Sequence, residues 1–379
     1  MLWVAWKMLI GNRVKYLGIV FGVMFAALLI AQQSSIFCGL MALTVSQIRD
    51  VQGPDIWVMD RHVQFVDDVK PLADTELFRV KGVPGVAWAV RFYKGIARAR
   101  LEEGTYEQMI LIGLDDATLV GAPEGVFLGS IADLRKPDAV IMDEAGYRRC
   151  WPGEPVRLGR IFEMNDRRAV LVGITKASRT FQSFPIVYTR YSQAVRFAPP
   201  ERKVLSFVLA EAEEGVDPEE ACRRIESRTG LQAVTKKQFV RKTILYYMAK
   251  TGIPVNFAIT VLLGFIVGTA IAGQTFYLFT VENIRQFGAL KAMGTSNWTI
   301  LLMVLSQAVQ VGVVGYGVGV GLAALFGYSA TSGLTRLSFF MPWQVLVMTA
   351  AAVFVIVLLA SLLSIRKVLV VDPAIVFRG

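Results

Sequence analysis

Four long segments without Asp, Glu, Lys, Arg or His constrain this fold more than any other feature of the sequence. They cover residues 16–48, 251–281, 292–335 and 337–365. Each exceeds the ~20 residues that a helix needs to cross a bilayer. The sequence therefore predicts transmembrane helices at 17–44, 251–281, 299–328 and 343–366. The first is long and has no clean small-x-small cleavage site, so we expect a retained span and not a signal peptide.

The basic residues outside the large soluble segment predict the topology. Residues 45–250 hold 31 Lys and Arg and 28 Asp and Glu, which leaves nine basic and two acidic residues for the rest of the chain. Eight of the nine flank the spans on one side, and they are Lys7, Arg13, Lys15, Arg285, Lys291, Arg366, Lys367 and Arg378. The short loop at 329–342 holds only Arg336. Short basic loops stay in the cytoplasm, so we expect an inner-membrane protein with both termini cytoplasmic. On this basis the net charge of +10 reflects orientation and not nucleic-acid binding.

The segment 45–250 has the pattern of a mixed α/β domain on the periplasmic side. Strands are predicted within 53–60, 87–101, 106–115 and 203–212, and a helix within 72–86. A strand-rich insert lies near 130–200, with further segments at 138–149, 154–159 and 167–177. "DPEEACRRIESRTG" predicts a helix with Asp217 as N-cap and Gly230 at its end, and "LQAVT" returns as a strand. The predicted fold class is thus an α-helical membrane protein with four transmembrane helices plus a large mixed α/β periplasmic domain inserted between the first and second.

The chain lacks the residues that most catalytic mechanisms need. No G-x-x-x-x-G-K-[ST] phosphate loop is present, and His62 is the single histidine. The interiors of the predicted spans hold no Asp, Glu, Lys, Arg or His along which a coupling ion would travel, which argues against a secondary transporter. We therefore expect no catalytic residue, metal site or cofactor in this chain. Cys150 and Cys222 lie in a compartment that permits a disulfide, but two free buried thiols are the favoured interpretation.

Glycines recur in the second and third spans at spacings that let helices approach closely. They are Gly264, Gly268, Gly315, Gly317, Gly319 and Gly321. Packing within one chain is the favoured use, and a dimer face is the alternative.

The stretch "FTVENIRQFGALKAMG" between the second and third spans has a helical pattern. Its apolar residues Ile284, Phe287, Leu290 and Met293 are three apart, and Glu282, Arg285 and Lys291 border them. Such a helix, predicted over 282–298, either offers its apolar side to a cytoplasmic partner or rests on lipid. The N-terminal segment 1–16 raises a similar choice between an amphipathic helix in the headgroups and a basic flank of the first span.

Several motifs resemble the FtsX/MacB-type ABC transporter permeases. "VENIRQFGALKAMG" is similar to the family segment E-x-x-x-E-[IY]-[AG]-x-L-[KR]-A-[ML]-G, and the terminal "RKVLVVDPAIVFRG" is similar to the family ending. The stretch from residue 234 to 294, with "GFIVG" and "LKAMG", resembles the DevC branch. The order of one span, a large external domain and three spans agrees along the whole chain.

The resemblance implies partners and roles. It implies a dimer with a second copy of the chain, and a separate cytoplasmic ABC ATPase that holds ATP and Mg. The segment 282–298 would be the coupling helix that docks on this ATPase, through Ile284, Phe287, Leu290 and Met293, with Glu282, Arg285 and Lys291 at the rim. Many members carry a second Glu where this chain has Gln286, so a charged contact is not carried over to that position.

The resemblance also implies mechanotransmission, in which ATP-driven motion passes through the spans to the external domain. A periplasmic membrane-fusion adaptor, an outer-membrane channel and export of a membrane lipid or other amphiphile follow from the same branch. Two alternatives stay open: an FtsX-like regulator of a cell-wall enzyme, and a haem-export permease.

Overall fold

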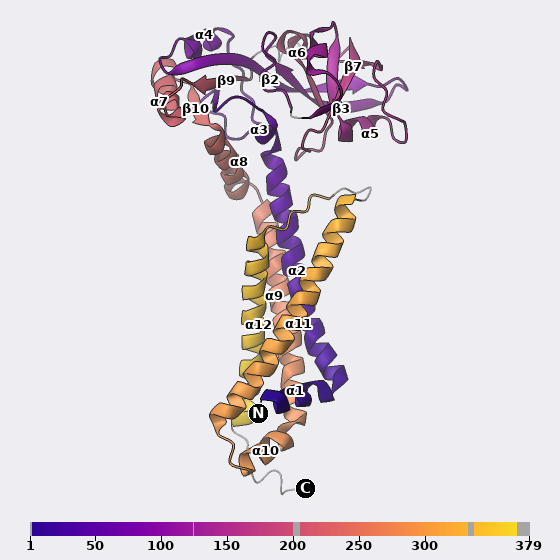
Figure 1. Ribbon diagram of the computed structural model, residues 1–379, viewed down its shortest axis with the longest axis vertical. Coiled ribbons are helices and arrows are strands. Elements are labelled where there is room, and N and C mark those ends of the chain that lie inside the picture. The colour runs from indigo at the N-terminus through magenta and orange to yellow at the C-terminus, as the bar shows by residue number, and fades with distance from the viewer. Residues whose placement is uncertain (1, 124, 200–204, 333–336, 370–379) are drawn as a thin grey trace. The chain divides into compact units, whose positions relative to one another are not determined.

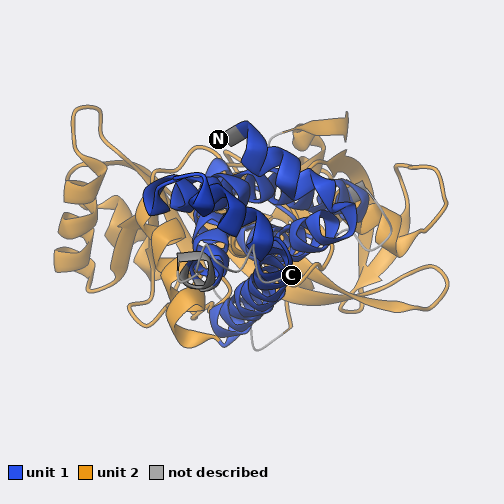
Figure 2. Ribbon diagram, turned by 90° about the horizontal axis from the view of Figure 1, so that it is seen from below, with its two compact units in different colours: residues 1–40, 252–379 blue, residues 41–251 orange. Residues whose placement is uncertain are grey.

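The computed structural model describes residues 2–123, 125–199, 205–332 and 337–369 (Figure 1). They form two compact units, and Figure 2 shows them in different colours. Unit 1 comprises residues 1–40 and 252–379, and unit 2 comprises residues 41–251. The predictions for Arg336 and for the tail beyond Leu369, including Arg378, lie outside the described residues.

Unit 1 is helical. Its elements are α1 (Leu2–Gly11), most of α2 (Arg13–Thr44), α9 (Ile253–Glu282), α10 (Ile284–Ala292), α11 (Asn297–Ser332) and α12 (Trp343–Leu369). Within the described residues, four helices are long and apolar enough to cross a membrane, namely Arg13–Thr44, Ile253–Glu282, Asn297–Thr331 and Trp343–Leu362. These helices coincide with the four charge-free segments of the sequence. A helix satisfies its own backbone hydrogen bonds, so an apolar segment of this length can be buried or face lipid as a helix.

The interior of unit 1 is one apolar cluster that all six helices reach. Ile19 of α2, Phe276 and Phe279 of α9, Val311 of α11 and Ile356 of α12 are all buried in it. The small helix α1 is separated from α2 by a bend at Asn12, whose side chain accepts a hydrogen bond from the backbone N–H of Lys15 at 3.4 Å. This cap explains why the N-terminal segment is a helix of its own.

Unit 2 is a mixed α/β unit built on a ten-stranded sheet. Its strands are β1 (Ile56–Met59), β2 (Val86–Arg100), β3 (Tyr106–Leu114), β4 (Val126–Gly129), β5 (Ala139–Asp143), β6 (Ile161–Met164), β7 (Arg167–Thr175), β8 (Ile186–Arg190), β9 (Phe207–Ala212) and β10 (Gln232–Thr235). Its helices are α3 (Ser46–Asp50), α4 (Thr75–Lys81), the 3₁₀ helix η1 (Ile131–Arg135), α5 (Glu144–Cys150), α6 (Tyr191–Phe197), α7 (Pro218–Thr229) and α8 (Lys236–Lys250).

The long strand β2 joins two parts of this sheet. Its first half pairs with β9, up to Phe92 opposite Phe207, and its second half pairs with β3 from Tyr93 onward. On the β9 side, β1 lies between β9 and β10 and is antiparallel to both. The unit β9–α7–β10 is therefore a split βαβ, as the sequence predicted, with α7 capped by Asp217 and ended by Gly230 at φ +74°.

An aromatic cluster fastens α8 to the sheet. The ring of Trp57 in β1 lies 5.5 Å from Phe92, 5.4 Å from Phe207 and 5.4 Å from Phe239 of α8, measured between centroids. The first turn of α8 carries a capping box between Thr235 and Gln238. Because α8 is fixed at its start and packed along its side, it is an integral part of unit 2.

Two details of the strand-rich insert differ from the sequence prediction. The second half of 138–149 is the helix α5 and not a strand, because the Asp143 side chain caps a helix through the backbone N–H of Gly146. Residues 154–159 hold no strand. Their proline and glycine residues favour turns, and the strand signal in that stretch was too short to override them.

Candidate functional site

The connector between α9 and α11 contains the short helix α10, at the same end of unit 1 as α1 (Figure 1). It is shorter than the predicted 282–298, because Glu282 ends α9 and Asn297 begins α11. Gly294 at φ +88° ends the helix, and Thr295 N–H donates to the Leu290 carbonyl at 3.1 Å. The Gly294 N–H donates to the Lys291 carbonyl at 2.9 Å. These two bonds form a Schellman motif, which needs the left-handed backbone that glycine adopts at no steric cost.

The four apolar residues predicted for docking do not share one exposed face. Phe287 is 0% exposed and belongs to the buried cluster of unit 1, whereas Met293 is 73% exposed. Ile284 and Leu290 are half-buried. Residues three apart on an α-helix are rotated by about 60° from one another, so the set spreads over half of the helix surface. The expectation that Phe287 is an accessible docking contact is therefore corrected: it anchors α10 to the bundle.

The polar residues of the connector also differ in their contacts and exposure. Glu282 forms an ion pair with Lys15 of α2, which links the connector to the N-terminal part of the chain. Arg285 and Gln286 are exposed, and Lys291 is half-buried in the last turn of α10. Arg285, Gln286 and Met293 are thus exposed on the connector, and the predicted rim residue Glu282 at the end of α9 is exposed as well.

Four of the six singled-out glycines lie where helices approach closely. A Cβ atom at Gly268 would lie 2.3 Å from the Ala26 Cβ, and one at Gly264 would lie 3.1 Å from the Leu29 Cβ. On α11, a Cβ at Gly315 would lie 2.7 Å from Val23, and one at Gly319 would lie 2.6 Å from the Met24 carbonyl oxygen. Both α9 and α11 therefore use glycine to pack against α2 within one chain.

The remaining two glycines point elsewhere. A Cβ atom at Gly317 or at Gly321 would meet no described atom within 4 Å. They lie on the side of α11 away from α2, together with the exposed Val313 and Val318. The two overlapping G-x-x-x-G pairs of the sequence thus occupy opposite sides of one helix.

Comparisons with known proteins match nearly the whole chain to one family. Residues 16–228 match the MacB-like periplasmic core domain, and residues 255–373 match the FtsX-like permease C-terminal domain. The chain belongs to the FtsX/MacB family of ABC transporter permeases.

Relatives of this permease carry matching names. An uncharacterized ABC transporter permease of Mycobacterium tuberculosis (strain ATCC 25618 / H37Rv) is 27% identical over 313 residues, which cover 82% of this chain and 80% of that protein. A second from the same strain is 26% identical over 336 residues, covering 87% and 86%. A Staphylococcus haemolyticus protein, provisionally named as the hemin transport system permease protein HrtB, is 32% identical over 158 residues, or 41% of this chain and 42% of that one.

Two solved structures are similar to about half of the permease. The periplasmic region of MacB from Actinobacillus actinomycetemcomitans aligns at 14% identity and a TM-score of 0.36, covering 54% of this chain and 97% of that one. The extracellular domain of the transporter YknZ from Gram-positive bacteria aligns at 16% identity and a TM-score of 0.34, covering 48% and 98%.

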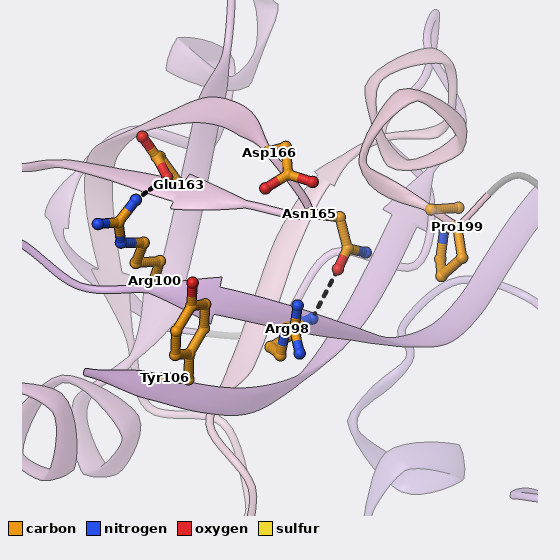
Figure 3. A pocket seen from close by; sticks show the side chains of 8 residues that line it. Arg98, Arg100, Tyr106, Glu163, Asn165, Asp166 and Pro199 are labelled. Carbon is orange, nitrogen blue, oxygen red and sulfur yellow. Dashed lines mark hydrogen bonds and ion pairs between the residues drawn. The ribbon is translucent and has the colours of Figure 1, made fainter. Parts of the chain in front are cut away.

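Unit 2 of the permease has an open surface pocket of about 220 Å³ that no sequence motif predicted (Figure 3). The Arg98 guanidinium lies 4.8 Å from the centre of the Tyr106 ring, and Arg100 pairs with Glu163 at 3.5 Å. The Arg98 backbone N–H donates to Asn165 Oδ1 at 3.1 Å. The described lining residues offer charges and hydrogen bonds, and they include no serine, cysteine or histidine.

A second cavity of about 390 Å³ lies where β2 passes from β9 to β3. Lys94 lines it and is buried; its Nζ donates to the Val66 carbonyl at 3.0 Å and pairs with Asp67. Burial lowers the pKa of Lys94, and Asp67 opposes that shift. The pair ties the loop after β1 to the middle of the sheet. Sequence reasoning missed it because the two residues lie on different segments, and neither stands in a motif.

The remaining candidate residues have ordinary surroundings. Cys150 and Cys222 are buried and free, as favoured from the sequence, and burial raises the pKa of each thiol to about 12. The exposed ring of His62 lies 2.9 Å from Asp60 through Nδ1. Among the described residues, no three His, Cys, Asp or Glu side chains gather as metal ligands would.

Proposed function

We propose that this permease is the membrane subunit of an ATP-driven exporter, and that a separate cytoplasmic ABC ATPase docks on α10 and hydrolyses ATP with Mg. A second copy of the chain completes the transporter. Both termini and α10 lie in the cytoplasm, and unit 2 lies in the periplasm of an inner-membrane protein. The basic residues Lys7, Arg13, Lys15 and Arg285 support this orientation.

One observation carries the docking proposal. α10 is fixed to the bundle by the buried Phe287 and closed by the Gly294 turn, while Met293 and Arg285 stay accessible. A short helix held rigidly at the end of two long helices transfers a push on its exposed side to both of them. An exposed methionine beside an arginine suits a groove with an apolar floor and an acidic rim.

The substrate class and the outer partners are the finer parts of the proposal. We infer that the permease moves its cargo by mechanotransmission, since the four long apolar segments carry no Asp, Glu, Lys, Arg or His in their sequence. A lipid or other amphiphile is the proposed cargo, with a periplasmic adaptor and an outer-membrane channel as partners. In sequence, only Thr251 and Gly252 separate α8 of unit 2 from α9, which suits the transfer of motion between them.

The test is capture of the ATPase by the full-length permease in detergent. Met293→Asp is expected to weaken the complex tenfold or more, because the new charge would enter an apolar contact. Phe78→Asp makes the same kind of change at an exposed apolar residue of unit 2 and is expected to bind like wild type. Phe287→Asp is unsuitable for this purpose, because the side chain is buried and its loss would disturb the bundle. Equal capture of Met293→Asp and wild type would reject docking at this surface.

Haem export is a second candidate, favoured by the relative named for hemin transport. A haem titration of the purified permease distinguishes the two. A stoichiometric absorbance change that is lost when a methionine or tyrosine of the permease is replaced would support haem export. No absorbance change would favour an amphiphile without iron. An FtsX-like regulatory role predicts complex formation with a cell-wall hydrolase and no cargo movement.

A further inference from the structure

The N-terminal helix α1 has one face turned into unit 1 and one face turned outward. Ala5 and Leu9 are fully buried, and Leu9 belongs to the same apolar cluster as Phe287. The side-chain amide of Gln307, itself fully buried in α11, donates to the Ala5 carbonyl at 2.7 Å. A buried polar group is thus used to hold α1 in place, so α1 is a fixed part of the bundle and not a free flank.

The outward face of α1 carries two tryptophans and a lysine. Trp3 is 67% exposed and Trp6 is 46% exposed. The Lys7 Nζ lies 5.5 Å from the centre of the Trp3 ring. Large exposed aromatic rings beside a basic side chain are typical of the boundary between lipid tails and headgroups, where the ring is half-buried and the charge meets phosphate.

Exposed apolar side chains continue into the first turns of α2, which follows α1 after the bend at Asn12. Val14 is 80% exposed, and Leu17 and Phe21 are exposed one and two turns further along the span. Exposed apolar side chains at the start of a helix long enough to cross a membrane are expected to lie against lipid. Because α1 adjoins this end of α2 in the chain, we expect its outward tryptophans to lie at the same boundary.

The charge on this surface has one sign. Lys7 and Arg13 are exposed, and Lys15 is paired with Glu282. The first 49 residues of the chain contain no Asp, Glu or His. Basic residues at a membrane surface are attracted to anionic lipid by about 1 kcal/mol each.

We propose that Trp3, Trp6, Lys7 and Arg13 form a binding surface for the headgroups of anionic phospholipids. This surface also supports the connector, since Leu9 shares a core with Phe287 of α10 and Lys15 pairs with Glu282 at the end of α9. Anionic lipid then holds the connector in its docking position. Only this last consequence rests on the proposed function; lipid binding stands without it.

The test measures the thermal unfolding of the full-length permease in neutral detergent, titrated with phosphatidylglycerol or phosphatidylcholine. Phosphatidylglycerol is expected to raise the Tm, and phosphatidylcholine is not, because only a ligand that binds the folded state stabilises it. In Lys7→Glu/Arg13→Glu the apparent affinity for phosphatidylglycerol falls by at least about 25-fold, at about fivefold for each basic charge removed. Lys81→Glu, an exposed lysine of unit 2, is the control and keeps the wild-type response.

A second measurement addresses the tryptophans. Brominated phosphatidylglycerol quenches fluorescence from rings at the membrane boundary, so Trp3→Phe/Trp6→Phe is expected to reduce the quenched fraction. An unchanged phosphatidylglycerol response in the double charge variant would overturn the proposal. So would a variant that loses ATPase capture while its lipid response stays intact, because the surface would then be a protein-docking face. Lost lipid response with intact capture supports lipid binding and rejects only its link to α10.

Discussion

The described interior of unit 1 is made mostly of small and apolar side chains with neutral polar groups such as Gln307, whereas the interior of unit 2 also holds ionisable groups. In unit 1, Gly268 and Gly319 let helices pack at backbone distance. In unit 2, Lys94 and Asp143 are buried in the sheet region with specific partners. In a bilayer no water remains to be expelled between helices, so close contact takes the place of the hydrophobic effect. In unit 2 the free energy gained by burying apolar surface is large enough to offset the cost of desolvating a few charged groups.

The largest expected effect concerns the two sides of α11. Gly319→Leu would force a side chain against the Met24 carbonyl, which cannot move without the backbone of α2. We expect a loss of about 3 kcal/mol in the unfolding free energy of the full-length permease. Gly321→Leu is the matched control, since a Cβ there meets no described atom. The measurement is unfolding in mixed micelles followed by circular dichroism, and equal losses in both variants would remove the distinction between the two glycine pairs.

An intermediate effect is expected from the buried ion pair of unit 2. Asp67→Ala leaves Lys94 buried without its carboxylate, and we expect a loss of about 3 kcal/mol or slightly less, because the Val66 carbonyl remains as an acceptor. Glu163→Ala removes one member of the exposed pair with Arg100, and a change within about 0.5 kcal/mol is expected. Urea unfolding of the full-length permease measures both. Similar losses would show that burial does not set the strength of the pair.

The smallest expected effect is a pH dependence from Asp143. Burial raises the pKa of this carboxyl, against hydrogen bonds from the backbone N–H groups of Ile186 and Gly146. Because the folded state binds the proton more tightly than the unfolded state, this group stabilises the fold most at acid pH. That contribution to stability is lost as the pH rises through the raised pKa. Above that pKa, Asp143 no longer makes the stability depend on pH.

Asp143→Asn removes this titration. The difference in unfolding free energy between wild type and variant should change with pH in the acid range and be flat at neutral pH. A loss of stability that does not depend on pH is also expected. The amide keeps only one acceptor oxygen, so it can accept from only one of the backbone N–H groups of Ile186 and Gly146. Thermal unfolding across the acid range provides the measurement. A difference independent of pH throughout would show that Asp143 titrates normally.

The helices of unit 1 and several elements of unit 2 were predictable because their signals are local. Charge-free runs longer than a bilayer, the N-cap Asp217 and the left-handed Gly230 act within a few residues. The connector was only partly predictable. Its helical pattern is local, but the predicted helix ran on to residue 298, past the turn at Gly294, and the burial of Phe287 depends on Leu9, Ile300 and other residues far away in sequence.

By itself, the sequence determined that four apolar helices and an α/β unit exist, where the capped helices end and which charges flank the spans. Period, length and capping are properties of neighbouring residues, so they need no tertiary partner. Only the tertiary structure decided that Gly319 packs while Gly321 does not, and that Met293 is accessible while Phe287 is buried. It also decided that Lys94 meets Asp67. In each case the outcome depends on which distant segment lies against the residue, and the local sequence pattern does not contain that information.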